Sequence, residues 1–186
     1  MGTIFDFCVF FYFFYCDQNS TSLIKMRYYF LHGLDSSSNG TKGRYFKKNF
    51  PDFIIPDFEG SLDMRMQKLE ALCSKPMGAG EPVVLVGSSF GGLMAACLAV
   101  KHPERAMRLI LMAPALNFPG LDIPEEKIAA PTYLLIGSCD TVTPAGAVIP
   151  IARQTFANLE INLVDEDHLL HQSFPLLDWN TLLYKW

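Results

Sequence analysis

The chain has 186 residues, of which 50% are hydrophobic and 18% are charged, and its formal net charge at pH 7 is −4. This length fits one domain with a sizeable core, and the low charge content is typical of a sheet covered on both faces. The net negative charge and the lack of any basic cluster argue against a nucleic-acid partner, because phosphate binding needs a basic surface.

The cysteine pattern points to a reducing compartment. The chain has five cysteines, an odd number, and they are scattered with no C-x-x-C pair. This is neither a disulfide framework nor a zinc-binding pattern, so we expect a cytoplasmic location. The cysteines are Cys8, Cys16, Cys73, Cys97 and Cys139.

The N-terminal segment Ile4–Cys16, "IFDFCVFFYFFYC", is aromatic throughout. It is shorter than the about 20 apolar residues of a membrane-spanning helix and lacks the basic start of a secretory signal. Met26 opens "MRYYFLHG", which is typical of a domain that begins on a strand. We expect residues 1–25 to be an extension outside the native domain and residues 26–186 to form the domain. The alternative is a membrane-surface anchor, so membrane contact is expected only if this segment is native.

From Arg27 onward, short apolar runs alternate with longer amphipathic segments, which is typical of βαβ units and a parallel sheet. Pro150 is expected to start or kink its helix, and Ser61 is a plausible helix N-cap. No repeat or linker is present. Strands are expected at residues 27–33, 52–56, 83–87, 108–114, 132–137 and 159–165. Helices are expected at residues 43–49, 61–74, 91–101 and 145–158, and in the C-terminal segment.

The stretch "LVGSSFGG" matches the pattern G-x-S-x-G, with Ser89 at the serine position, a strand before it and a helix after it. A sharp strand-to-helix turn strains the backbone of the central residue and turns its side chain outward. Gly87 and Gly91 leave room for the neighbouring strand and helix. The hydroxyl would lie at the positive end of the helix, so Ser89 is the candidate nucleophile. The alternative is a glycine-rich turn capped by a serine.

A nucleophilic serine needs a base and a carboxylate that orients the base, and both candidates follow later strands. Asp140 comes directly after the strand in "TYLLIGSCD", and His168 follows the last strand in "INLVDEDH". The order serine, acid, histidine agrees with this arrangement of strand ends. The sequence therefore predicts a triad of Ser89, Asp140 and His168.

The end of the first strand supplies a candidate oxyanion hole. His32 and Gly33 lie there, and the main-chain amides of Leu34 and Phe90 are the expected donors to a developing oxyanion. We expect His32 to orient this loop by hydrogen bonding rather than to act as the base.

Several alternatives exist for each role. Ser88 is the alternative nucleophile, but the small residue two positions after it would be missing. His171 is the alternative base and would share a face with His168 in a helix. Asp165 and Asp167 are alternative acids, but they lie too close in sequence to His168 and fit loop-capping or solvated carboxylates better. These Asp and His residues lack a further spaced ligand, so we expect no metal site.

The motifs "FLHGLDSS", "LVGSSFGG", "IGSCDTVTP" and "EDH" together resemble the α/β-hydrolase superfamily from residue 26 to the C-terminus. The short chain and the "LHGLDSS" start resemble the small YqiA-like esterases within it. The resemblance implies an α/β-hydrolase fold, a mostly parallel sheet flanked by helices, although the first two strands of larger members are missing unless the aromatic segment supplies one. Larger members carry a cap at the position of Asn117–Ala130, which is short here, so we expect an open, shallow site for small or extended acyl groups.

The implied activity is hydrolysis of a small-molecule ester or thioester through an acyl-enzyme, with no cofactor. A peptidase is less favoured, because peptide selection on this fold usually needs a cap or a propeller. The hypothesis from another class is a non-catalytic protein of this fold that binds a small ligand or a partner.

Overall fold

The computed structural model describes residues 26–73 and 82–185. The aromatic segment predicted to lie outside the domain falls outside these described residues. In chain order the elements are β1 (Arg27–Leu31), α1 (Thr41–Asn49), β2 (Phe53–Ile54), α2 (Leu62–Cys73), β3 (Val83–Ser88), α3 (Phe90–Lys101), β4 (Ala106–Met112), β5 (Thr132–Gly137), α4 (Ala145–Thr155), β6 (Leu159–Val164), α5 (Ser173–Leu176) and α6 (Trp179–Tyr184).

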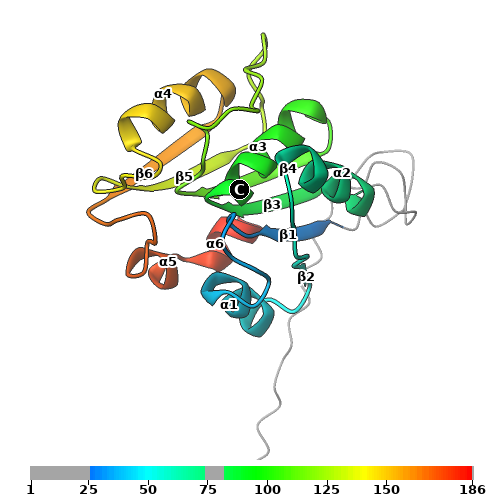
Figure 1. Cartoon of the computed structure of the whole chain (residues 1–186), viewed down its shortest axis with the longest axis vertical. Helices are drawn as coiled ribbons and strands as arrows, with labels where there is room; N and C mark the ends of the chain where they lie inside the picture. The colour runs from blue at the N-terminus through cyan, green and yellow to red at the C-terminus, as the bar shows by residue number, and fades with distance from the viewer. Residues whose placement is uncertain (1–25, 74–81, 186) are drawn as a thin grey trace, which may run out of the picture.

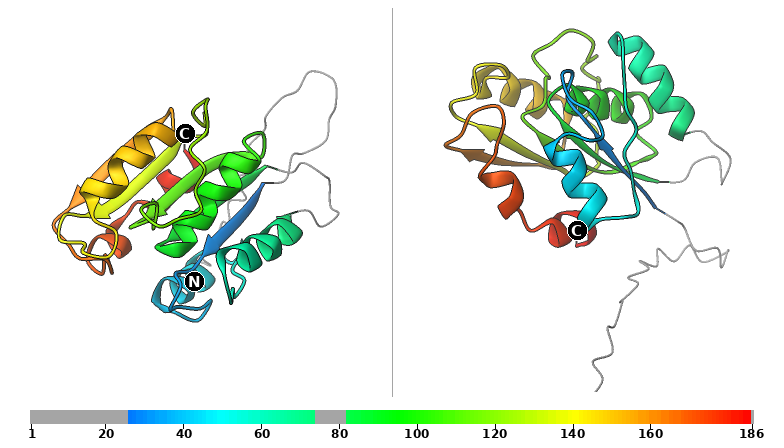
Figure 2. Two further views of the ribbon diagram at one scale, coloured as in Figure 1. Left: turned by 45° about the horizontal axis from the view of Figure 1, so that its top comes forward. Right: turned by 60° about the horizontal axis from the view of Figure 1, so that its bottom comes forward.

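The strands form one six-stranded sheet in the order β2-β1-β3-β4-β5-β6, and every neighbouring pair is parallel. Helices α2, α3 and α4 cover one face of the sheet, and α1, α5 and α6 cover the other (Figures 1 and 2). The predicted architecture, a parallel sheet flanked by helices, is therefore confirmed. Because all strands run the same way, their carboxyl ends meet along one edge of the sheet.

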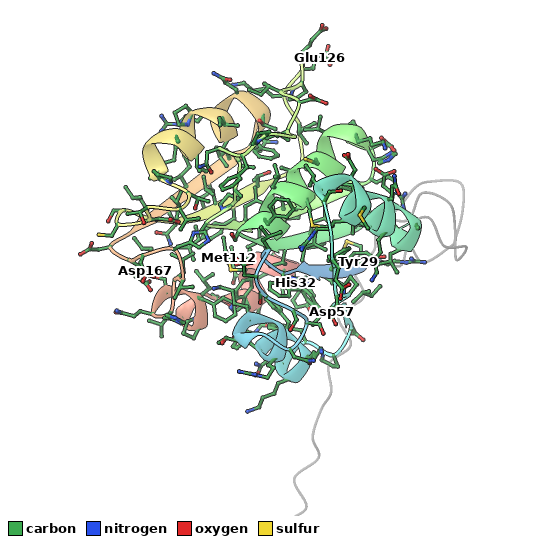
Figure 3. All side chains as sticks on the ribbon, viewed as in Figure 1. Tyr29, His32, Asp57, Met112, Glu126 and Asp167 are labelled. Atoms are coloured by element: carbon green, nitrogen blue, oxygen red, sulfur yellow. The ribbon has the colours of Figure 1, made fainter. Side chains whose placement is uncertain are left out.

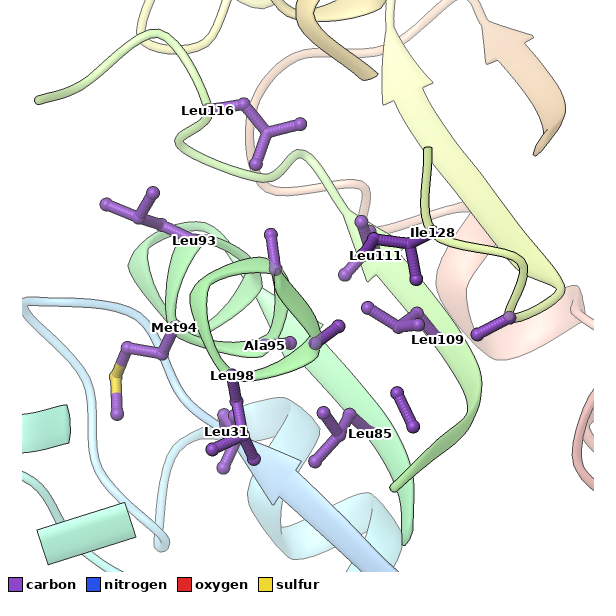
Figure 4. Close-up of a cluster of buried hydrophobic side chains, with 14 of the residues drawn as sticks. Leu31, Leu85, Leu93, Met94, Ala95, Leu98, Leu109, Leu111, Leu116 and Ile128 are labelled. Atoms are coloured by element: carbon purple, nitrogen blue, oxygen red, sulfur yellow. The ribbon is translucent and has the colours of Figure 1, made fainter. Parts of the chain in front are cut away.

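Strand β3 shows how the apolar runs build two cores. Its side chains alternate between the sheet faces, so Leu85 joins the cluster under α3 while Val84 and Val86 join the cluster under α1 and α6. Figure 4 shows the first cluster, with Leu85 and Leu109 of the sheet beneath α3. Helix packing on both faces explains why this strand reads as a continuous apolar run.

Helix α3 approaches the sheet closely because small residues face it. A Cβ atom at Gly92 would lie 2.6 Å from Cβ of Pro114, and Ala95 and Ala96 are fully buried. This close approach fixes the start of α3, and with it the bend that carries Ser89.

Some boundaries differ from those predicted. Helix α4 begins at Ala145 and contains Pro150, so of the two expected effects Pro150 does not start the helix, and the kink stays a prediction. The C-terminal segment is helical as expected but forms two short helices, with Asp178 capping the second. The Ser61 N-cap is confirmed, since the Met64 amide donates to its Oγ at 3.4 Å.

The segment between β4 and β5, where a cap was expected to be short, contains no helix. It holds only an isolated bridge from Ile128 to Phe156, and Figure 3 shows Glu126 at its tip, projecting away from the sheet. None of the helices in residues 26–73 and 82–185 is long and apolar enough to cross a membrane.

Candidate active site

Ser89 lies at the bend between β3 and α3, and its backbone is strained. Its φ of 54° and ψ of −119° lie in a region that L-residues rarely adopt. A Cβ atom at Gly87 would lie 2.7 Å from the Cα of Gly92, and one at Gly91 would collide with the carbonyl of Leu31. Only glycine fits at both positions, so the bend has the geometry that the G-x-S-x-G pattern predicts.

The structure brings Ser89, His168 and Asp140 together, although they follow three different strands. His168 Nε2 lies 2.9 Å from Ser89 Oγ, and His168 Nδ1 lies 2.8 Å from Asp140 Oδ2. With the proton of the imidazole on Nδ1, His168 donates to the carboxylate and accepts from the serine hydroxyl. The Asp140 side chain is fully buried, while that of His168 is 19% exposed. The arrangement can take a proton from Ser89 and stabilise the resulting imidazolium.

The carboxylate of Asp140 is held from several directions. Its Oδ1 accepts from the main-chain amides of Val142 and Thr143, each at 2.8 Å. Its Oδ2 accepts from Thr143 Oγ1 at 2.6 Å as well as from His168. Burial alone would raise the pKa of Asp140, but the hydrogen bonds from Thr143 and His168 outweigh it and hold the pKa below its ordinary value. Asp140 therefore stays ionised opposite the imidazole.

Thr143 is a site residue that the sequence analysis missed. Its side chain is fully buried, and its hydroxyl lies 3.2 Å from His168 Nδ1 and 3.2 Å from the carbonyl of Ala113. The available signal was the threonine three positions after the acid in "DTVT", a spacing at which a side chain and an amide can both reach back to a carboxylate.

The loop that carries His168 is fixed at both ends. Glu166 accepts from the amides of Gln172 and Ser173, at 2.8 Å and 2.7 Å, which closes the loop around the histidine. Lys42 of α1 donates to the carbonyl of Leu169 at 2.7 Å. These contacts hold the imidazole against the bend.

The residues expected to form an oxyanion hole lie beside Ser89. A Cβ atom at Gly33 would lie 3.3 Å from the Cβ of Ser89, so the loop after β1 touches the bend. Among the described residues, the amides of Leu34 and Phe90 donate in none of the hydrogen bonds that the structure contains. Phe90 is the first residue of α3, where a free amide and the helix dipole both favour a negative charge.

His32 lies beneath this loop and is hydrogen bonded to its backbone. It is buried, its Nδ1 donates to the carbonyl of Gly33 at 2.8 Å, and its Nε2 accepts from the amide of Phe58 at 3.0 Å. Figure 3 shows His32 near Asp57, whose Oδ1 lies 3.7 Å from Nε2. Both ring nitrogens are engaged away from Ser89, so His32 is placed to orient the loop.

The alternative residues lie elsewhere. Residues 168–172 form turns rather than a helix, so the shared helical face expected for His171 is absent, and His171 is exposed. Asp165 accepts from Ser138 and Cys139, and Asp167 accepts from the amide of Leu169, so both carboxylates cap loops. His168, rather than His171, is the histidine hydrogen bonded to Ser89. In the described part of the chain, no three or more His, Cys, Asp or Glu side chains are grouped so that they could hold a metal ion.

A parallel sheet with a serine bend after β3, an acid after β5 and a histidine after β6 is the arrangement of the α/β-hydrolase fold, and this chain has that fold. The family model for the α/β hydrolase fold matches residues 69–130. A protein of the α/β hydrolase superfamily from Xanthomonas campestris pv. campestris is 26% identical with a TM-score of 0.64, covering 78% of this chain and 89% of its own. The monoacylglycerol lipase of Paleococcus ferrophilus has a TM-score of 0.62 at 18% identity, covering 79% and 90%.

By sequence, the chain is similar to lipase LipV of Mycobacterium tuberculosis, with 32% identity over 113 residues. This match covers 59% of the chain but only 41% of the lipase. The chain spans less than half the length of the curated relatives that it matches. The resemblance to the YqiA-like esterases stays a prediction.

Proposed function

We propose that this protein is a serine hydrolase that cleaves carboxylic esters or thioesters through an acyl-enzyme on Ser89. The observation that carries the proposal is the continuous hydrogen-bonded path from Ser89 Oγ through His168 to Asp140. Similarity to lipases supports an acyl substrate, and the short segment between β4 and β5 favours small or extended acyl groups at an open site.

The acylation step follows from these distances. His168 Nε2 takes the Ser89 proton as Oγ bonds to the acyl carbon, and the carbonyl electrons move to its oxygen. The amides of Leu34 and Phe90 stabilise this oxyanion. When the carbonyl re-forms, the bond to the leaving oxygen or sulfur breaks, and His168 passes its proton to the leaving group.

Deacylation repeats these steps with water. His168 takes a proton from a water molecule as its oxygen bonds to the acyl carbon, and collapse of the intermediate breaks the bond to Ser89 Oγ. The proton returns to Ser89, and the carboxylic acid leaves. Asp140 stays ionised throughout and stabilises the imidazolium in each half-reaction.

A fluorophosphonate probe tests the nucleophile, with a neighbouring serine as the matched control. We expect the parent protein and Ser88→Ala to be labelled and Ser89→Ala to remain folded but unlabelled. Labelling lost only in Ser88→Ala would overturn the assignment. A folded parent that is never labelled would favour a non-catalytic binding protein. A panel of p-nitrophenyl esters and acyl-CoA thioesters of graded chain length then identifies the acyl and leaving groups.

A further inference from the structure

Helix α2 carries a buried arginine on the face that packs against the core, where the helical repeat predicts apolar residues. Arg65 is only 4% exposed and shares this face with buried Leu69 and Cys73. Arginine is rarely buried this deeply without a paired carboxylate, since removing a charge from water costs free energy. The position of Arg65 therefore needs an explanation beyond packing.

The contacts of this guanidinium lead to the loop after β1 and to the start of α3. Nη2 donates to the carbonyl of Leu34 over a long 3.4 Å, and Cζ lies 5.3 Å from the ring centroid of Phe90, within cation–π range. Nε donates to the carbonyl of Gly60 at 3.0 Å, which ties the guanidinium to the start of its own helix. One side chain thus contacts both residues whose amides are the expected oxyanion donors.

The charge of Arg65 is not neutralised locally. Its Nη1 is buried with no hydrogen-bond partner among the described residues, and no carboxylate there forms an ion pair with it. Burial lowers the pKa of Arg65, while Asp35 and Glu59 oppose this from longer range. A buried cation with an unpaired N–H costs free energy, but this occurs elsewhere in the described chain too, so the contacts with Leu34 and Phe90 are what set Arg65 apart.

We propose that Arg65 is a positioning residue of the oxyanion hole, holding the Leu34 carbonyl and the Phe90 ring so that their amides converge, and adding a fixed positive charge nearby. This inference rests on the proposed function. The Leu34 side chain is 48% exposed and does not anchor its loop. His32 holds the loop on one side, and Arg65 holds it on the other. Negative charge develops only during the reaction, so a preset cation favours the transition state over the ground state.

The test compares Arg65→Met, which keeps length but removes charge and donors, with Arg65→Lys, which keeps the charge but loses the planar fork. Arg108→Met is the control, because Arg108 is 8% exposed and lies toward the amino end of β4, away from Ser89. Active sites are titrated with a fluorophosphonate, so kcat refers to folded protein. Hydrolysis of neutral p-nitrophenyl butyrate and anionic mono-p-nitrophenyl succinate is then measured, together with inhibition by phenylboronic acid, which forms a tetrahedral serine adduct.

We expect Arg65→Met to lower kcat for both esters by at least about tenfold, with KM within about twofold, because the interaction exists only when the oxyanion forms. The inhibition constant of phenylboronic acid should rise by a similar factor. The kcat of Arg65→Lys should lie between that of the parent and that of Arg65→Met, and Arg108→Met should keep the parent kcat. The melting temperature of Arg65→Met should stay the same or rise, whereas a merely structural arginine would lower it.

A kcat per titrated site in Arg65→Met equal to that of the parent overturns the inference. A loss confined to KM for the anionic ester also overturns it and makes Arg65 a substrate-anion site instead. If Arg65→Met does not fold, full parent kcat in Arg65→Lys is the overturning result. A parent that hydrolyses neither ester refutes the proposed function along with the inference, whereas an active parent with an unaffected variant refutes the inference alone.

Discussion

Replacing Thr143 by valine tests how the carboxylate of Asp140 is stabilised. Valine has nearly the same shape as threonine, so the buried space stays filled and the amide of residue 143 still donates to Oδ1. The change removes the hydroxyl, which donates to Asp140 Oδ2 at 2.6 Å and also lies 3.2 Å from the Ala113 carbonyl and from His168 Nδ1. The contact with Asp140 is the shortest of these, and its contribution depends on the charge of the carboxylate.

The expected loss depends on pH, because hydrogen bonding holds the pKa of Asp140 below its ordinary value. A depressed carboxyl pKa stabilises the folded state above the unfolded value of about 3.9, and this stabilisation is lost as pH falls through the folded pKa. A hydrogen bond to a charged group contributes about 1.5–3 kcal/mol. Thr143→Val should therefore lose about that much unfolding free energy at pH 7, and the pKa of Asp140 should rise.

As pH falls, the carboxyl is protonated first in the folded variant, whose Asp140 pKa is the higher of the two, and then in the folded parent, whose pKa lies below the ordinary value. The gap should narrow over this range toward the about 0.5–1.5 kcal/mol of a neutral hydrogen bond. Chemical unfolding from pH 7 down to the lowest pH at which both proteins stay folded measures this narrowing gap. The matched control is Thr155→Val, since the buried Thr155 hydroxyl donates at 2.9 Å to the neutral carbonyl of Ile151. The loss of unfolding free energy in Thr155→Val should be small and independent of pH. A gap for Thr143→Val that stays constant across this pH range would refute the argument.

Two further pairs of variants test the bend and the base. Gly91→Ala should lower the unfolding free energy by about 1–3 kcal/mol or more, because its Cβ would press on the carbonyl of Leu31. A Cβ atom at Gly146 in α4 would meet nothing within 4 Å, so Gly146→Ala should raise the unfolding free energy by about 0.4–1 kcal/mol. Thermal or chemical unfolding measures both variants, and equal effects at the two glycines would contradict the steric reasoning. His168→Gln should lower kcat by at least about a thousandfold, while His171→Gln should leave it near the parent value. The reverse pattern in a p-nitrophenyl ester assay would make His171 the base.

The sheet and the candidate triad were predictable because each rests on a local pattern. Strands covered on both faces read as short apolar runs, and the topology brings their carboxyl ends to one edge. Ser89, Asp140 and His168 each follow such a run directly, so their order along the chain was enough to place them together. The G-x-S-x-G pattern also predicted the strained φ of Ser89, since the bend permits little else.

Helix ends and supporting residues were harder to predict, because they depend on partners distant in sequence. Helix α1 begins two residues before the predicted Gly43, with no side-chain cap to mark its start. Helix α4 tolerates Pro150 because packing on the sheet and hydrogen bonds to the Pro144 carbonyl set its start. Thr143 and Arg65 differ from these cases. Their positions were visible in the sequence, but the atoms they bind were not.

Several buried polar side chains lie around the serine bend, and stability and function conflict there. His32, Arg65, Asp140 and Thr143 all contact the loops around Ser89, whereas other buried polar residues, such as Arg108 and Thr155, lie elsewhere in the fold. Burying a polar group costs free energy unless its hydrogen bonds are complete, and an apolar core would avoid that cost. The proposed role of Arg65 would explain why a polar residue lies on an apolar face of α2, against the hydrophobic pattern.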